Sequence, residues 1–304
     1  MPQSITGNGA LLKIALGTAR FGMDYGIGKD GKQVRQGEVF CILSKAAEAG
    51  VEVIDTAHGY GESEKIIGSY LRTNKNSFKV ISKLPKCSRD DVAKLFKESL
   101  RDLGVEAIYG YLVHSFTSYK ADNGIWDELC RLKSEGKVKK IGFSLYYPSE
   151  LEELLNKNLK FDIVQIPCSV LDQRFFPYLK ILTERGVEIH ARSIFLQGLL
   201  LQAPAELNGR FKEIFVKLTA LREMSRSSGV PLELLCLLFV ALNGNIDKAV
   251  IGMGSVRHLE SNIEAFKYGS KAGSIYEDLL SLREDDEDII VPARWAMEAG
   301  KSNS

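Results

Sequence analysis

Four side chains that can carry charge or exchange protons follow three successive apolar runs of the sequence. Asp55 and Tyr60 come after the run that begins at Val51, Lys83 closes the next run, and His114 closes the one after it. A tyrosine phenol has a pKa of about 10, and a neighbouring cation lowers that value because it stabilises the phenolate. Lys83 can be that cation, Asp55 can keep its ammonium charged when it is partly buried, and His114 can hydrogen-bond a carbonyl oxygen. These residue types can together deliver a proton to an oxygen that becomes an alkoxide.

Each of the four residues also has an ordinary structural explanation. Asp55 could cap the next turn, and Lys83 could be a solvated lysine at the end of a strand. Tyr60 could pack on a loop, and His114 could be a core histidine. The coincidence of positions favours a site, because all four fall at the carboxyl ends of consecutive predicted strands. Parallel barrels hold their working residues at that end.

The elements that would position these residues alternate in type along the chain. Short β-branched and apolar runs predict strands, and amphipathic stretches between them predict helices, some of which close on a glycine such as Gly50 or Gly104. The predicted strands are Leu12–Leu16, Val51–Asp55, Lys79–Lys83, Ile108–His114, Lys139–Ser144, Asp162–Ile166, Glu188–Arg192 and Lys248–Gly252. This pattern predicts an α/β fold, a (β/α)8 TIM barrel, formed as a single domain by residues 1–304.

An open doubly wound sheet is the rival fold. Such a sheet usually carries G-x-G-x-x-G after its first strand, and the sequence has Gly17-Thr18-Ala19-Arg20-Phe21-Gly22 there instead. The barrel is therefore favoured. Two segments interrupt its repeat. The polar connection from Gln202 to Lys212 predicts a flap over a ligand, and the segment 284–304, which starts with the acidic run Glu284 to Asp288, predicts a peripheral, solvated tail.

Composition excludes several classes of function. A formal net charge of +1 offers no field to hold a polyanion, so we do not expect nucleic acid as a partner. No apolar run approaches the roughly 20 residues needed to span a bilayer, and Leu232 to Leu242 follows Pro231 as a buried helix would. Residues 1–9 show no secretory signal pattern. The five cysteines are scattered and the four histidines do not cluster with them, so we expect reduced thiols, a cytoplasmic protein and no metal site.

The order of motifs resembles that of the aldo-keto reductase family over nearly the whole chain. The matching pieces are Asp55-Thr56-Ala57, Tyr60-Gly61 and Ser63-Glu64, then Lys83, His114, Gly142-Phe143-Ser144, Gln165, Gly198-Leu199-Leu200, Gly252 with Ser255, and Asn262. The resemblance implies that Tyr60 is the general acid and that Lys83 and Asp55 tune it. It also implies that His114 positions a small-molecule carbonyl substrate.

Reduction of a carbonyl also needs a hydride, which no side chain can store, so a nicotinamide cofactor must bring it. The resemblance implies that this cofactor lies across the mouth of the barrel. Its expected contacts are Ser144 and Gln165 at the carboxamide, Ser193 and Gly198 at the pyrophosphate, Ser255, Arg257, His258 and Asn262 at the adenosine, and also Gly17, Thr18, Asp55, Arg192, Leu200 and Gly252. Arg257 at the start of a helix predicts a site for a 2′-phosphate. We therefore expect NADP(H), with NAD(H) less favoured, although Arg257 could also be a solvated first-turn residue.

Two positions depart from the family pattern. Leu145 stands where an asparagine is usual, which removes a polar contact, and Arg192 stands where a tyrosine often stacks on the nicotinamide. A guanidinium can stack on a ring, but it repels the positively charged oxidised nicotinamide. Two hypotheses for Arg192 stay open: a bias toward the reduced cofactor, or a contact for an anionic group of the substrate.

Substrate contacts are expected from the loops at the rim of the barrel. The candidates are Phe21, Tyr25, His58, Tyr60 and His114, with Tyr146 and Phe195 nearby. Gln173 and Arg174 either belong to a polar patch at the site or are solvated residues at a helix start. Sugar-derived aldehydes or ketones are favoured as substrates because the rim is polar, whereas the reaction direction and the oligomeric state stay open.

Two other functions compete with a reductase. A non-catalytic NADP(H)-binding sensor or regulatory subunit would share the fold, but it would not need all four candidate catalytic residues. An aldolase would use Lys83 as a Schiff-base nucleophile. That chemistry requires a depressed lysine pKa, which the adjacent Asp55 opposes.

Overall fold

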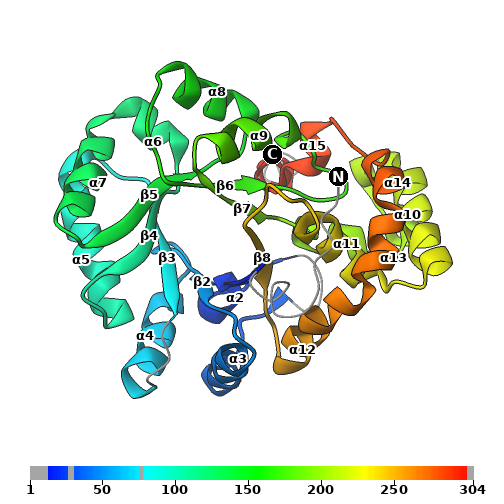
Figure 1. Ribbon diagram of the computed structural model, residues 1–304, viewed down its shortest axis with the longest axis horizontal. Coiled ribbons are helices and arrows are strands. Elements are labelled where there is room, and N and C mark those ends of the chain that lie inside the picture. The colour runs from blue at the N-terminus through cyan, green and yellow to red at the C-terminus, as the bar shows by residue number, and fades with distance from the viewer. Residues whose placement is uncertain (1–12, 27–30, 75–77, 300–304) are drawn as a thin grey trace.

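Eight parallel strands close into a barrel in sequential order in the computed structural model, which describes residues 13–26, 31–74 and 78–299 (Figure 1). The strands are β1 (Ile14–Gly17), β2 (Val53–Asp55), β3 (Lys79–Leu84), β4 (Ile108–Val113), β5 (Val138–Ser144), β6 (Ile163–Pro167), β7 (Glu188–Arg192) and β8 (Lys248–Gly252). The predicted TIM barrel is confirmed. Leu12, the predicted start of the first strand, and residues 1–9, where no signal was expected, lie outside the described residues.

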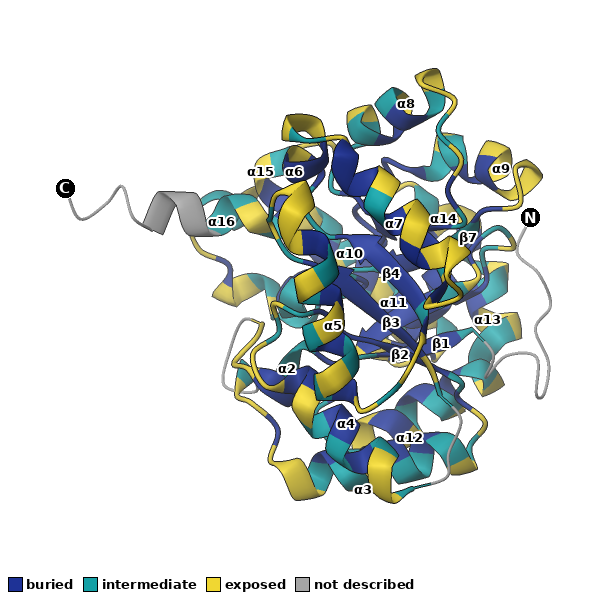
Figure 2. Cartoon of the chain, turned by 90° about the vertical axis from the view of Figure 1, so that its left-hand side faces the viewer, coloured by how far each residue is buried: buried dark blue, intermediate teal, exposed yellow. Residues whose placement is uncertain are grey.

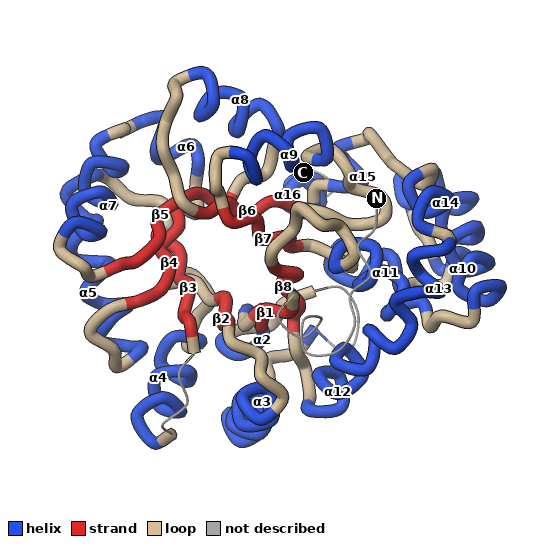
Figure 3. Tube along the Cα trace, viewed as in Figure 1, coloured by secondary structure: helices blue, strands red, loops and turns tan. Residues whose placement is uncertain are grey.

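Helices cover the outside of the ring of strands, as Figure 3 shows. The main ones are α3 (Gln36–Glu48), α4 (Ser63–Thr73), α5 (Val92–Leu103), α7 (Gly124–Ser134), α8 (Pro148–Asn156), α9 (Phe176–Glu184), α11 (Leu232–Ala241) and α12 (Val256–Glu264). Gly104 ends α5 with a φ of 67°, a left-handed conformation that a glycine adopts without steric cost. Short helices α2 (Ala19–Gly22) and α6 (Phe116–Ala121) follow β1 and β4.

The core has two layers because successive side chains of a strand point to opposite faces. One cluster fills the barrel interior and consists of Ala15, Val53, Ile81, Leu112, Ile163 and Val250. We call these six residues the inner ring. A larger cluster, which includes Leu16, Ile54 and Val164, packs between the strands and the helices. In Figure 2 the strands are accordingly dark blue and the helices are yellow on their outer faces.

A long connection follows β7, as the polar run there predicted. It consists of three 3₁₀ segments, Leu196–Leu201, Pro204–Glu206 and Gly209–Ile214, and of helix α10 (Phe215–Ser228). Helix α11 is buried along almost its whole length. Among the described residues no single helix is long and apolar enough to cross a membrane; Gly209–Ser228 and Leu232–Ala241 pass such a test only as a pair, bent by 94°.

The segment that was expected to be a peripheral acidic tail is anchored to the barrel. It contains α15 (Glu287–Ile290) and α16 (Pro292–Ala299), and Ile289, Ile290 and Val291 are buried. Glu284 pairs with Lys217 of α10 at 2.9 Å. Helices α13 (Gly269–Ser274) and α14 (Tyr276–Leu280) lead to this segment.

Candidate active site

The mouth of the barrel is built from the residues that end each strand. Register pairs place Gly17 beside Asp55 and Gly252, and Ser144 beside Gln165. The parallel register brings these ends to one level, because neighbouring strands run in the same direction. The structure therefore brings together, at one end, the side chains that the sequence predicted there.

Asp55 and Lys83 form a buried ion pair under this mouth. The Lys83 Nζ donates to Asp55 Oδ1 at 2.6 Å and to the Thr56 carbonyl at 3.0 Å, and its side chain has no exposed surface. The Gln165 amide donates to the other carboxylate oxygen of Asp55 at 2.7 Å. Charged groups are tolerated in such a place only when they are paired and hydrogen-bonded. The network fixes Lys83 in position and keeps its charge compensated.

Tyr60 lies between Lys83 and His114. The Lys83 Nζ is 5.1 Å from the centre of the Tyr60 ring, and the His114 ring meets the Tyr60 ring edge-on with centroids 5.9 Å apart. The loop that carries Tyr60 contacts α2 so closely that a Cβ atom on Gly22 would lie 1.9 Å from the Tyr60 carbonyl oxygen. Gly61 has a φ of +57°, and a Cβ atom there would meet the Gly22 carbonyl. Two glycines thus set the position of the phenol.

The electrostatics of Tyr60 differ from the sequence-based prediction. Burial raises the pKa of Tyr60 well above its ordinary value and Asp55 adds to the rise, while Arg192 acts in the opposite direction. The prediction of a lowered Tyr60 pKa was wrong, because burial raises this pKa more than the nearby cations lower it, and the Asp55 carboxylate adds to the rise. A phenol with a raised pKa keeps its proton at neutral pH, and this is the form that can donate.

His114 is held in its neutral form. Burial, followed by the charges of Lys83 and Arg192, lowers the pKa of His114 to about 3. A neutral imidazole offers one N–H donor and one acceptor nitrogen. His114 can therefore donate a hydrogen bond to a carbonyl oxygen, but at neutral pH it does not compete with Tyr60 as a source of protons.

A cavity of about 570 Å³ opens above this cluster. Twelve of the residues predicted from the sequence line it, namely Gly17, Thr18, Tyr25, Asp55, Tyr60, Gln165, Arg192, Ser193, Gly198, Gly252, His258 and Asn262. Lys83, His114, Ser144, Leu200, Ser255 and Arg257 are not among the lining residues; Lys83 and Ser144 are buried at the barrel end and Arg257 is exposed. The volume is in the range of small-molecule sites.

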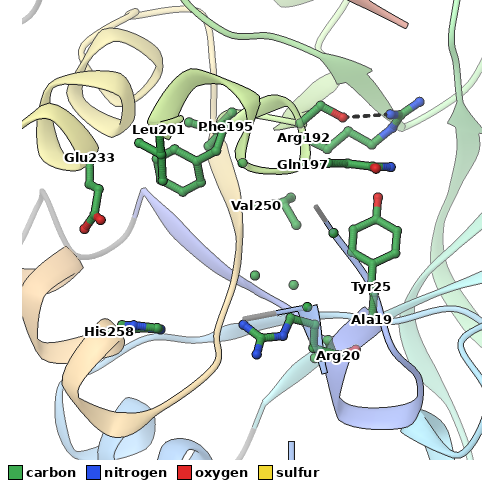
Figure 4. A pocket seen from close by; sticks show the side chains of 18 of the residues that line it. Ala19, Arg20, Tyr25, Arg192, Phe195, Gln197, Leu201, Glu233, Val250 and His258 are labelled. Atoms are coloured by element: carbon green, nitrogen blue, oxygen red, sulfur yellow. Dashed lines mark hydrogen bonds between the residues drawn. The ribbon is translucent and has the colours of Figure 1, made fainter. Parts of the chain in front are cut away.

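Besides His114, two of the predicted substrate contacts are not among the residues that line this cavity. Phe21 is fully buried in the core, and His58 turns outward, where its ring lies 3.7 Å from Glu64 and 3.9 Å from Glu98. Neither side chain is among the lining residues. Tyr25 does line the cavity, and in Figure 4 it extends toward Gln197. The structure thus turns two of the predicted rim residues away from the mouth.

The mouth has features that fit a nicotinamide cofactor. The Ser144 hydroxyl is buried and has no hydrogen-bond partner among the described residues, and it lies beside Gln165. Buried hydroxyls usually have a partner, so a carboxamide would satisfy this one. After β7 the chain holds Ser193, Gln197 and Gly198 at positive φ. Such backbone turns can aim N–H groups at an anion, as a pyrophosphate requires.

The far end of the cavity carries both signs of charge. His258 and Arg20 project toward it, as does Glu233 (Figure 4). Ser255 caps α12, because its hydroxyl accepts from the His258 backbone N–H at 3.2 Å. Glu38 reaches the same helix start, where its carboxylate accepts from the Val256 N–H at 2.9 Å. Sequence reasoning missed Arg20 and Glu38, because neither belongs to a recognisable local motif.

The two positions that depart from the family pattern contact each other. Leu145 is fully buried, and its carbonyl accepts a hydrogen bond of 2.8 Å from Arg192. The Arg192 guanidinium also donates to the Ser193 hydroxyl at 3.1 Å and covers the Tyr146 ring at 4.2 Å from its centre. The backbone carbonyl of Leu145 thus helps to hold the Arg192 guanidinium, while the leucine side chain packs in the core.

Gln173 and Arg174 have structural partners. Arg174 pairs with Asp172 at 2.9 Å and with Glu287 of α15 at 2.9 Å, and Gln173 donates to the Val170 and Leu280 carbonyls. These contacts join the loop after β6 to the C-terminal segment. Neither residue lines the cavity.

Comparisons with known proteins define the class. The model of the aldo/keto reductase family matches residues 13–274, so the chain belongs to this family of oxidoreductases. It is similar to the uncharacterized oxidoreductase YqkF of Bacillus subtilis, at 24% identity over 83% of this chain and 90% of that protein. It is also similar to the D-threo-aldose 1-dehydrogenase of a Pseudomonas species, at 24% identity over 82% and 90%.

Solved structures show the same fold. The aldo-keto reductase AKR11C1 from Bacillus halodurans, in its holo form, superposes with a TM-score of 0.70 at 20% identity over 86% of this chain and 91% of that one. The glycerol dehydrogenase AKR11B4 from Gluconobacter oxydans gives a TM-score of 0.68 at 19% identity over 92% of both chains. Among the described residues no group of three or more His, Cys, Asp or Glu side chains could hold a metal ion.

Proposed function

We propose that the protein is an NADP(H)-dependent reductase of an aldehyde or ketone, with Tyr60 as the proton donor. The observation that carries this proposal is the placement of a protonated phenol between a buried ammonium and a neutral imidazole, at the end of a cavity. The bound nicotinamide supplies a hydride to the carbonyl carbon. Side chains of the protein orient the carbonyl group and supply the proton.

Each side chain has a separate task in this proposal. His114 donates a hydrogen bond that orients the carbonyl oxygen, and Tyr60 gives its proton to that oxygen as negative charge develops. Lys83 stabilises the phenolate that Tyr60 leaves behind, and Asp55 holds the ammonium in place through the 2.6 Å contact. Tyr60 is half-buried at the wall of the cavity, and its partial desolvation strengthens these electrostatic effects.

The cofactor is assigned to the contacts that the family resemblance implies. Ser144 and Gln165 would hold the carboxamide, and Ser193, Gly198 and Leu200 would border the pyrophosphate. Gly17, Thr18, Asp55, Arg192 and Gly252 lie at the mouth, and Ser255, Arg257, His258 and Asn262 at the adenosine end. The unpartnered Ser144 hydroxyl supports the first of these assignments.

Charge at the adenosine end supports NADP(H) over NAD(H). Arg20 and His258 line that end and Arg257 opens α12, so a 2′-phosphate would meet positive charge. Glu38 acts against it, because its carboxylate occupies the Val256 N–H. The preference can be measured as the ratio of the Kd values for NADH and NADPH from nucleotide fluorescence. Arg257→Gln should lower this ratio and Glu38→Gln should raise it, and an unchanged ratio in both variants would refute the assignment.

The enzyme assignment is tested by NADPH consumption with aldoses, aryl aldehydes such as 4-nitrobenzaldehyde, and ketones. Tyr60→Phe should lower kcat by about 100- to 10,000-fold, the range for loss of a positioned acid, and should still bind NADPH. Tyr268→Phe, remote from the cavity lining, is the matched control. Binding of NADPH without turnover of any substrate would favour a sensor. Trapping of a substrate on Lys83 by borohydride would favour an aldolase.

Sugar-derived carbonyl compounds remain the proposed substrates. Two of the similar proteins, the D-threo-aldose 1-dehydrogenase and an L-galactose dehydrogenase of Arabidopsis thaliana at 25% identity, act by their names on sugars. All five cysteines are free thiols in the structure, which is consistent with the cytoplasmic location that we propose.

A further inference from the structure

Arg192 is a cation at the cavity with no acidic partner. It lines the cavity, and it forms no ion pair with any residue in the described part of the chain. Its partners are neutral: the Leu145 carbonyl, the Ser193 hydroxyl and the Tyr146 ring. Partly buried arginines usually pair with a carboxylate. The guanidinium therefore has donors left for a ligand, since two of its five N–H groups are used.

The Arg192 guanidinium is held by a residue that follows a different strand. Arg192 ends β7, yet it hydrogen-bonds the carbonyl of Leu145, which follows the end of β5. Strand β6 lies between these two, so the side chain extends over the end of β6 to the end of β5. The guanidinium accordingly perturbs the pKa values of both Tyr60 and His114.

The charges near the proposed reaction centre do not cancel. Lys83 and Asp55 compensate each other, and His114 is neutral. Arg192 is then the uncompensated charge beside Tyr60. Three acidic residues also line the cavity, namely Asp55, Glu206 and Glu233. Asp55 is paired with Lys83, and Glu233 lies at the other end of the cavity, as Figure 4 shows. An anionic group of a ligand could therefore pair with the Arg192 guanidinium.

We propose that the substrate is a carbonyl compound that carries a carboxylate or phosphate group, and that Arg192 binds this group. The inference rests on the proposed reductase function and specifies its substrate class. The carbonyl oxygen would lie between Tyr60 and His114, and the anionic group would extend over Tyr146 to the guanidinium. Tyr146 and the Leu145 carbonyl are positioning residues that hold the guanidinium in place.

The test compares matched substrates that differ in charge. 4-Carboxybenzaldehyde is set against its neutral methyl ester, and D-glyceraldehyde 3-phosphate against D-glyceraldehyde, so that the two pairs separate carboxylate from phosphate. The wild-type enzyme should favour the charged member of at least one pair by about 10- to 100-fold in kcat/KM, the effect of a charge-assisted hydrogen bond. The preference should appear mainly in KM, because the contact exists before and during the reaction.

Variants locate the preference at Arg192. Arg192→Met should abolish the preference, and Arg192→Lys should keep part of it, because a lysine retains the charge but not the planar fork. Arg101→Gln on α5, whose side chain is 70% exposed, is the control and should keep the full preference. Calorimetric binding of 4-(hydroxymethyl)benzoate in the presence of NADP⁺ gives a readout independent of turnover, and Arg192→Met should weaken that binding by a similar factor.

The outcomes separate this inference from the reductase assignment. Turnover of both members of each pair with equal kcat/KM would overturn the anionic substrate and leave the reductase standing. A change in the ratio of NADPH to NADP⁺ affinity in Arg192→Met, without a change in substrate preference, would also overturn it and would assign Arg192 to the cofactor. No turnover of any carbonyl compound would instead overturn the proposed function.

Discussion

Replacement of Lys83 by methionine should destabilise the protein strongly. The variant removes an ammonium with no exposed surface and leaves Asp55, whose side chain is 4% exposed, without its 2.6 Å partner. Removal of one member of a buried ion pair costs about 3 to 5 kcal/mol, because a desolvated charge stays behind. The unfolding entropy is about 2.1 cal/mol/K per residue, hence about 0.64 kcal/mol/K over 304 residues. The melting temperature should therefore fall by about 5 to 8 °C.

Two further variants show whether the buried charge causes this loss. Lys79→Met removes the other lysine of β3, which pairs with Glu52 on the surface, where both side chains are more than 40% exposed. That change should cost less than about 1 kcal/mol. The double variant Lys83→Met with Asp55→Asn removes both charges, so it should be more stable than Lys83→Met alone by at least about 2 kcal/mol.

Unfolding in urea is monitored by circular dichroism, and calorimetry gives the melting temperature as a second readout. A loss below about 1 kcal/mol in Lys83→Met would refute the reasoning, because it equals the effect expected of an exposed pair. A double variant less stable than Lys83→Met would refute it as well. The lost stability would then come from packing and not from an uncompensated carboxylate.

Three other outcomes are expected. Because the pKa of His114 is about 3 and that of Tyr60 is raised, both groups stay in one protonation state from about pH 5 to about pH 8, and kcat/KM for reduction should be constant there; a transition centred near pH 7 would contradict this. Ser144→Ala should weaken NADPH binding about 5- to 10-fold in a fluorescence titration without loss of stability, because its hydroxyl has no partner to lose; equal affinities would argue against a carboxamide contact. Gly22→Ala should lower kcat about 10- to 100-fold by displacing the Tyr60 loop, whereas Gly37→Ala, whose added Cβ meets nothing within 4 Å, should not; equal kcat values in the two variants would exclude the positioning role.

The strands and the ends of the strands were predictable from the sequence. Periodicity in β2 and β3 fixes which side chains face inward, and both Asp55 and Lys83 do so. The register pairs Asp55 with Ile81, which places Lys83 at the next inward-facing position of β3. The contact of Lys83 with Asp55 follows from this register. Predictions of this kind depend on regular backbone geometry, which a single sequence does encode.

Side-chain directions in the loops were not predictable. His58 is only three residues after Asp55, but Glu64, Glu98 and Ser99 draw it outward, and two of these lie on α5. Phe21 lies on α2, and packing against the core buries its side chain completely. The predicted direction of the Tyr60 pKa shift was wrong too, because burial, which a single sequence does not report, is the largest cause of the shift. Long-range packing decides such details, and no local pattern reports them.

The inner ring forms an apolar layer in the barrel interior. Its six side chains lie below Asp55 and Lys83, and the cavity opens on the other side of that ion pair. His190 contacts Glu188 through its Nε2 at 2.7 Å, and its Nδ1 has no hydrogen-bond partner within the described part of the chain. Because Tyr60 lines the cavity, a proton that it gives up in a catalytic cycle can be replaced from the solvent at the mouth of the barrel. Reprotonation of Tyr60 would then wait until the alcohol product has left the cavity, which couples product release to the start of the next turnover.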